Sequence, residues 1–240
     1  MCEFLVQGAA SLLLDQASTL TALVLAQKFF SQRRKYSLLI LTALVNMITW
    51  LYRWRNSFSQ YDARIIAGAC LFISTKSCEV PRTLRSVANV VHAVANDTDE
   101  PLGTGSRYAD LKMSLINAEQ TVLRVLGFEV DVAMPLNFLF SYAHQNGFSA
   151  STMLCSLRLA SDVYFDVRAL ELPGFVVAAA SLRIASVLLH EDRLAAHGEK
   201  WWYLYDTSDE DVAHVARILL HVYQFTDQQQ ELAHFLASGK

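Results

Sequence analysis

Two apolar segments of this chain resemble each other closely enough to indicate a duplication. "RIIAGACLFIST", Arg64 to Thr75, aligns without gaps with "FVVAAASLRIAS", Phe175 to Ser186, at an offset of 111 residues. The identical pairs are Ala67 and Ala178, Ala69 and Ala180, Leu71 and Leu182, and Ile73 and Ile184. A period this long is not that of a solenoid. Each segment is apolar all round and small in its middle, which predicts a buried helix at the centre of one of two copies of a helical domain. A chance alignment of two apolar helices is the alternative.

The rest of the 240 residues also favours helices. No Gly or Pro lies between Gly8 and Gly68, an unusually long interval without the residues that mark turns. Charged residues make up 18% and hydrophobic residues 53% of the chain, which fits a globular fold rather than disorder. The hydrophobic periodicity predicts helices at Cys2 to Asp15, Thr19 to Phe30, Tyr36 to Trp54, Ala63 to Lys76, Thr83 to Val94, Arg107 to Leu126, Pro135 to Gln145, Ser151 to Phe165, Gly174 to Leu189 and Glu210 to Phe225.

Several function classes lack the residues they would need. A formal net charge of −3 gives no electrostatic reason to expect a nucleic-acid groove. The P-loop, GxGxxG and GxSxG motifs are missing from the sequence, so we do not expect an enzyme or a cofactor. His214 and His221 lie seven residues apart on one predicted helix, a spacing that packing or solvated histidines explain better than a metal site. The four cysteines lack CxxC pairing, which favours a reducing, intracellular setting.

Lys76 and Glu119 interrupt the apolar pattern. Glu119 falls inside the apolar arc of the helix expected from Arg107 to Leu126, where loss of hydration is costly without a partner. Lys76 ends the buried helix before it and is the obvious partner. In a structural interpretation the two charges only join two helices of the bundle. In a functional interpretation they fix the orientation of another protein at the rim of an apolar surface. The pattern alone favours the structural interpretation.

Two longer stretches resemble the cyclin box. They are "AGACLFISTKSCEVPRTLRSVANVVH" and "INAEQTVLRVLGFEVDVAMPLNFLFSYA", which match the family in order and spacing. The resemblance covers nearly the whole chain and implies an all-α fold of two tandem cyclin-like five-helix domains: residues 1–130, with an extra apolar helical insertion at about 31–54, and residues 131–240. Within the family the chain looks most like cyclin Q, also called cyclin M, on "KFF", "YDARIIAGACLFISTK" and the late segment that holds Trp201 and Trp202.

The resemblance also implies a function and a binding site. A cyclin is the regulatory and activating subunit of a cyclin-dependent Ser/Thr kinase and contributes no catalytic group. Lys76 and Glu119 match the pair that contacts the αC helix of the kinase, and Ile73, Phe128 and Val130 match apolar positions of the same surface. Glu79 follows the Lys, but Cys78 stands where the family usually has a second acidic residue, which puts any ionic contact there in doubt.

The expected partner is therefore a cyclin-dependent kinase. The cyclin Q subgroup would point to the tenth-numbered member of that kinase family, and a cyclin would act in the nucleus, the cytoplasm or both, in the cell cycle or in transcription. No direct nucleic-acid contact is expected, and membrane association is not favoured. The alternative functions are a nucleic-acid-binding factor of the transcription-factor-IIB type and a membrane-associated helical protein.

The apolar span from Tyr36 to Tyr52 has no counterpart in a cyclin box. Its 17 residues are at the lower limit for crossing a bilayer, and Thr42, Asn46, Thr49 and Arg53 would form a polar stripe that suits an interfacial helix better. An extra surface helix and a membrane-interacting helix are two interpretations. We favour a third, a translated intron, because removal of about Ser31 to Trp54 restores a short loop between "KFF" and "YD".

Overall fold

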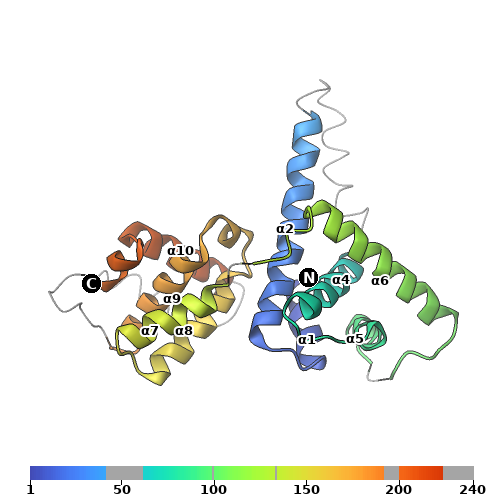
Figure 1. Cartoon of the computed structure of the whole chain (residues 1–240), viewed down its shortest axis with the longest axis horizontal. Helices are drawn as coiled ribbons and strands as arrows, with labels where there is room; N and C mark the ends of the chain where they lie inside the picture. The colour runs from blue at the N-terminus through green and yellow to red at the C-terminus, as the bar shows by residue number, and fades with distance from the viewer. Residues whose placement is uncertain (42–61, 99, 133, 192–199, 224–240) are drawn as a thin grey trace. The chain divides into compact units, whose positions relative to one another are not determined.

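The structure is a computed structural model that describes residues 1–41, 62–98, 100–132, 134–191 and 200–223. Within these ranges all regular secondary structure is helical, which confirms the expected all-α class. The chain divides into two compact units, Met1–Val132 and Ala133–Lys240. We call them unit 1 and unit 2 (Figure 1).

Unit 1 is built around α4, Ala63–Ser77, the first of the two similar apolar segments. The other helices of the unit are α1 (Cys2–Ser11), α2 (Gln16–Leu41), α5 (Leu84–Asn96) and α6 (Ser106–Val125). Asp62 caps the start of α4 by accepting a hydrogen bond from the backbone N–H of Arg64. From Ile66 to Leu71 every residue of the helix is buried. Because α4 packs against α1, α2, α5 and α6, it is the central helix that the sequence predicts.

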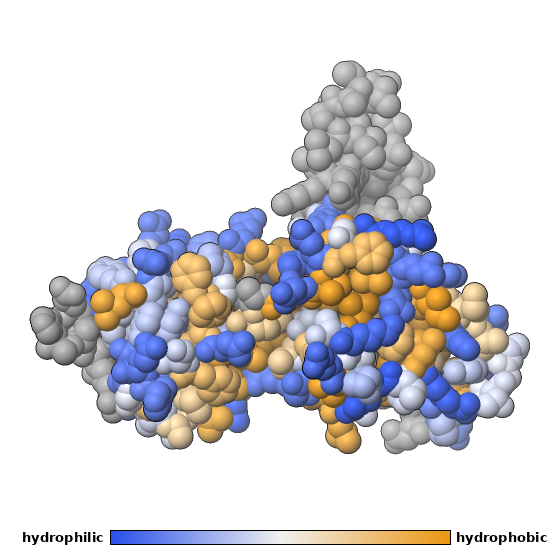
Figure 2. Space-filling view, viewed as in Figure 1, coloured by the Kyte–Doolittle hydropathy of each residue, from blue (hydrophilic) through white to orange (hydrophobic). Residues whose placement is uncertain are grey.

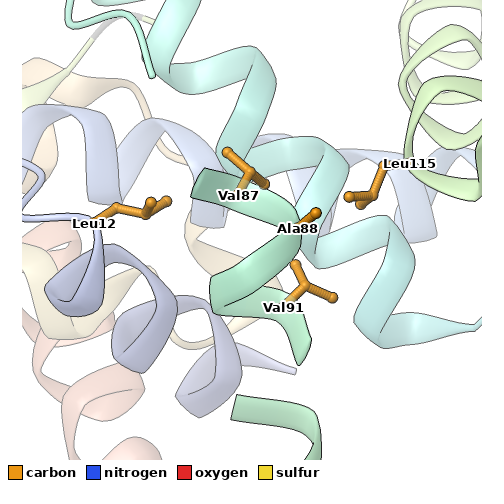
Figure 3. Packing of buried hydrophobic residues seen from close by; sticks show 5 residues of the cluster. All are labelled: Leu12, Val87, Ala88, Val91 and Leu115. Carbon is orange, nitrogen blue, oxygen red and sulfur yellow. The ribbon is translucent and has the colours of Figure 1, made fainter. Parts of the chain in front are cut away.

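Small residues in α4 allow α5 and α6 to approach its backbone. Val87, Ala88 and Val91 of α5 meet Leu115 of α6 in one buried cluster, which Leu12 joins from the turn after α1 (Figure 3). Gly68 faces this cluster. A Cβ atom added at Gly68 would lie 2.5 Å from Cγ2 of Val91 and 2.9 Å from Cδ2 of Leu115, so a side chain has no room there.

We expect Gly68→Ala to destabilise unit 1. Overpacking costs about 1 to 3 kcal/mol, and a contact as close as 2.5 Å favours the upper part of that range, about 2 to 3 kcal/mol. The better helix propensity of alanine recovers about 1 kcal/mol. The free energy of unfolding should therefore fall by about 1 to 2 kcal/mol, as measured by urea denaturation. Gly103→Ala is the control, because no atom lies within 4 Å of an added Cβ there. Equal stability of the two variants would contradict this account of the packing.

The structure corrects the expected helices near the start of the chain. α2 is one continuous helix from Gln16 to Leu41, whereas the sequence pattern predicts separate helices that begin at Thr19 and Tyr36. The polar residues at 32–35 are good helix formers and include no Gly or Pro, so nothing stops the helix. In Figure 1 the C-terminal part of α2 extends beyond the other helices of unit 1. Residues 42–54 of the predicted insertion lie outside the described residues.

The first helix is shorter than expected and ends at Ser11 rather than Asp15. Leu13 adopts the left-handed conformation, with φ of 51°, and its side chain is exposed. Arg82 donates hydrogen bonds to the carbonyl oxygens of Leu12 and Leu13 at 3.0 and 3.1 Å. The guanidinium of Arg82 therefore supplies partners for carbonyls that the end of the helix leaves open.

Unit 2 repeats the arrangement around α9, Gly174–Leu188, which is the second of the similar segments. The helices around it are α7 (Pro135–Gln145), α8 (Ala150–Val163) and α10 (Asp209–Tyr223), with short 3₁₀ helices η1 (Val167–Glu171) and η2 (Trp201–Tyr205). α9 packs against α7, α8, α10 and η2. The duplicated segments thus occupy equivalent central positions in the two units.

Polar contacts fix the ends of the helices in unit 2. Glu191, just after α9, accepts hydrogen bonds from the hydroxyls of Ser149 and Thr152 at 2.6 and 2.5 Å, which joins the end of α9 to the start of α8. α10 begins at Asp209, one residue before the predicted Glu210, and the acidic residues of its first turn complement the positive end of the helix. The carboxylate of Asp209 accepts hydrogen bonds from Nε1 of Trp202 and the hydroxyl of Tyr203. These contacts hold η2 against the start of α10.

Candidate protein-binding site

Lys76 and Glu119 form the ion pair that the sequence predicts. Lys76 lies in the last turn of α4, where a cation complements the negative end of the helix, and Glu119 lies on α6. The distance from Nζ of Lys76 to Oε1 of Glu119 is 2.5 Å. The side chain of Lys76 is 50% exposed and that of Glu119 is 15% exposed. The pair therefore joins two helices and still presents its cation to solvent.

An aromatic ring completes the surroundings of Lys76. Nζ of Lys76 lies 3.8 Å from the centroid of the ring of Phe72, within the range of a cation–π interaction. Phe72 is half-buried and comes one turn before Lys76 on α4. Phe72 is not among the predicted site residues, because an aromatic residue in an apolar run is usually a core residue. The spacing of four residues on one helix is the signal that could have identified it.

The chain turns sharply after Lys76. Glu79 is exposed and has a left-handed backbone, with φ of 58°. Sγ of Cys78 lies 3.4 Å from Oγ1 of Thr21, which belongs to α2. The position where the cyclin pattern usually has an acid is thus occupied by a side chain that contacts the inside of unit 1, and Glu79 supplies the carboxylate at this corner.

The loop after α6 carries the expected apolar residues. Phe128 is 68% exposed and has a φ of 62°, a conformation that is uncommon for a bulky residue. Its backbone N–H donates to the carbonyl of Leu123, and the N–H of Val130 donates to the carbonyl of Phe128. Val130 is half-buried. The tight turn therefore holds the Phe128 ring out in solvent.

Ile73 differs from the other predicted site residues. It is only 3% exposed, because its position on α4 faces the interior of unit 1. The role of Ile73 in partner binding therefore stays a prediction, in which only this small exposed part of the side chain would touch a partner.

Other chemistry receives little support in the part of the chain that the structure describes. His221 Nδ1 lies 3.0 Å from the carboxylate of Asp166, which also binds Arg168. No group of three His, Cys, Asp or Glu residues that could hold a metal ion occurs within the described ranges. Among the helices of those ranges, none is both long and apolar enough to span a membrane. Cys70 is fully buried, and burial raises the pKa of its thiol.

Comparisons with known proteins identify similar chains. No protein-family model matches. Cyclin L homolog cyl-1 of Caenorhabditis elegans is 25% identical over 92% of this chain and 46% of its own length. Cyclin-L1 of Gallus gallus is 27% identical over 92% of this chain and 38% of its own length, and Cyclin-T1-5 of Arabidopsis thaliana is 24% identical over 93% and 35%. The chain thus spans less than half the length of these three curated relatives.

A solved structure shows the same fold. One chain of the crystal structure of the yeast RNA Pol II CTD kinase CTDK-1 complex superposes with a TM-score of 0.72 at 14% identity, and the match covers 100% of this chain and 74% of that chain. At this level of identity the likeness shows that the two chains share a helical fold, and the ion pair of Lys76 and Glu119 lies on the surface of unit 1 in this fold. In sequence, the chain is similar to cyclins L and T.

Proposed function

We propose that the chain is a cyclin, the regulatory and activating subunit of a cyclin-dependent Ser/Thr kinase. The observation that carries this proposal is the half-exposed Lys76 paired with Glu119 across α4 and α6. Lys76 and Glu119 would contact the αC helix of the kinase. Phe128 and Val130 would contribute apolar contacts, and Glu79 would add a negative charge at the edge of this binding surface.

The exposure of the pair favours binding over a purely structural role. An ion pair with one half-exposed partner contributes only about 0 to 1 kcal/mol to stability. In an interface that excludes water, the same charges determine orientation and specificity much more strongly. Phe128 supports this view, because a large exposed side chain in an uncommon backbone conformation has little to gain in the free chain.

The surface of unit 1 includes hydrophobic patches of the kind found in protein interfaces. On the face of unit 1 in view, Figure 2 shows hydrophobic patches bordered by hydrophilic residues, an arrangement similar to the apolar core and polar rim of protein interfaces. A kinase bound at Lys76 and Glu119 would change its own conformation by population shift. The chain would bind the active arrangement of the αC helix more tightly than the inactive one, which aligns the Lys–Glu pair of the kinase for phosphoryl transfer.

The subgroup and partner are finer parts of the proposal. Trp201 and Trp202 favour cyclin Q, and that subgroup would pair with the tenth-numbered cyclin-dependent kinase. The relatives reported above are cyclins L and T, and the structural neighbour belongs to an RNA Pol II CTD kinase complex. We therefore propose a role in transcription rather than in the cell cycle, which would place the protein in the nucleus at least part of the time.

Capture of kinases by the intact chain and by a chain without residues 31–54 tests the function. We expect the shortened chain to fold and to capture the same kinase at least as well. The buried residues of α2, among those whose side chains the structure describes, lie between Ser18 and Phe29, so the deletion spares this contact with α4. The readout is mass spectrometry of purified cyclin-dependent kinases retained on the immobilised chain, with circular dichroism as the control for folding.

The control for kinase capture is the intact chain with Lys76→Ala. Failure of both the intact and the shortened chain to retain any kinase, while both remain helical, would contradict the proposal. The origin of the insertion is tested separately by sequencing the transcript. A spliced message that still encodes Tyr36 to Tyr52 would contradict the intron hypothesis and leave the kinase proposal untouched.

A further inference from the structure

We infer that Phe72 is a positioning residue whose ring holds the ammonium of Lys76 in the orientation in which it meets a partner protein. The inference rests on the proposed function for its biological meaning and on the contacts of α4 and α6 for its geometry. Nζ of Lys76 lies 3.8 Å from the centroid of the Phe72 ring and 2.5 Å from Oε1 of Glu119. The ammonium is therefore held from two sides.

Packing fixes the ring of Phe72. Phe72 is one of the partly buried residues packed against the core cluster that includes Val87 and Leu115. One part of the ring is thus held by the core, and its face remains available to Lys76. A ring anchored in this way makes a rigid platform, because it lacks the rotational freedom of a surface side chain.

The hydrogen-bonding capacity of Lys76 shows what the two contacts leave for a partner. A lysine ammonium has three N–H donors and no acceptor. Glu119 accepts from this ammonium, and the negative face of the Phe72 ring attracts it from a second direction. Since the lysine side chain is half exposed, its remaining donor capacity is directed toward solvent. We conclude that Lys76 presents a directed donor rather than a freely moving charge.

Restraint before binding lowers the entropic cost of the complex. A free lysine side chain loses about 1.5 to 2 kcal/mol of rotamer entropy when it is immobilised, and a side chain held in advance avoids part of that loss. The ion pair with Glu119 alone would be weakened by salt. The additional contact with Phe72 keeps the ammonium in place in the free chain, where solvent reaches half of the lysine side chain.

The contact between Phe72 and Lys76 is tested first without any kinase. In the full chain labelled with ¹³C-lysine, the protons on Cε of Lys76 should resonate upfield of those of a lysine remote from any ring, because the adjacent Nζ lies 3.8 Å from the centroid of the Phe72 ring. The signal is assigned by its loss in Lys76→Met. Phe72→Leu should remove the upfield shift and Phe72→Tyr should keep it. The inference is overturned if the wild-type signal shows no such shift, or if the shift survives Phe72→Leu.

The role of Phe72 in binding is tested by a double-mutant cycle with the captured kinase. Phe72→Leu should weaken binding about two- to fivefold, the usual effect of one exposed cation–π contact, and Phe72→Tyr should retain the wild-type affinity. In the Lys76→Met background, Phe72→Leu should have no further effect. An undiminished effect in that background would show that Phe72 acts directly or through folding, and would overturn the inference. Urea denaturation of each variant measures any loss of stability.

The two experiments separate this inference from the proposed function. If the upfield shift depends on Phe72 but no kinase binds the wild-type chain, the proposed function fails. The inferred contact between the Phe72 ring and the Lys76 ammonium is still supported. If a kinase binds through Lys76 and Phe72→Leu has the same affinity for it as the wild-type chain, the proposed function stands. The positioning role of Phe72 is then excluded.

Discussion

Replacement of both Lys76 and Glu119 by alanine should abolish capture of the kinase and leave the chain folded. Truncation of a charged group that becomes buried in an interface costs about 2 to 5 kcal/mol, so binding should weaken at least about 30-fold. The stability of the free chain should change little, because Lys76 is half exposed and such pairs stabilise a fold by about 1 kcal/mol at most. Kinase capture and circular dichroism, measured on the same preparation, provide the two readouts.

A matched control is available on the same helix. Arg107 and Asp110 are exposed and lie in the first turns of α6, whereas Glu119 lies near its other end. Arg107→Ala with Asp110→Ala removes the same number of charges and should leave kinase capture unchanged. If the Lys76 and Glu119 double variant unfolds, the pair is structural. Normal folding with full capture would exclude the pair from the binding surface.

Trp201→Ala should destabilise unit 2 more than any other single replacement proposed for the fold. Trp201 is completely buried. Its ring lies edge-to-face with Phe148, Trp202 and Tyr205, at centroid distances of 5.4, 5.6 and 6.0 Å. Loss of a buried tryptophan leaves a large cavity, and the expected decrease in the free energy of unfolding is about 3 to 5 kcal/mol.

Hydrogen exchange followed by mass spectrometry locates this effect. Peptides from α7, α9 and α10 should lose protection in Trp201→Ala, and peptides from α4 and α6 should keep theirs. Leu204→Ala is the control, because Leu204 lies on the same 3₁₀ helix and is 65% exposed. A Trp201→Ala chain as stable as the Leu204→Ala chain would show that η2 is not part of the core of unit 2.

The central features of the fold could be predicted from the sequence because they depend on strong local patterns. The two similar apolar segments became α4 and α9, since only a helix surrounded by neighbours buries an apolar surface on all sides. The hydrophobic periodicity that begins at Glu210 predicted the start of α10 to within one residue. These signals depend on the residues of a single element.

Other features depended on contacts between elements and were missed. The left-handed conformation of Leu13 ends α1 early, and the carbonyls there are satisfied by Arg82, which is distant in sequence. The 3₁₀ helix η2 is held by Asp209 and by stacking of Tyr205 on Tyr142, with ring centroids 3.7 Å apart. Neither arrangement has a periodic pattern that would reveal it.

The candidate site also combines a feature that a local sequence pattern predicts with features that depend on contacts between helices. The pairing of Lys76 with Glu119 could be predicted, because a carboxylate inside an apolar arc requires a nearby cation. The burial of Ile73 and the contact of Phe72 with Lys76 could not, since both depend on how α4 is rotated toward α6. Rotation of about 100° separates neighbouring residues on a helix, so one position decides between the core and the surface.

The measurement that tests the proposed kinase surface most directly is photo-crosslinking from position 128. A photoreactive phenylalanine analogue in place of Phe128, which is 68% exposed, should cross-link to the captured kinase, and mass spectrometry should locate the bond in its αC helix or in the strand before that helix. A cross-link from position 128 to another part of the bound kinase, or the absence of any cross-link while the kinase remains bound, would contradict the account.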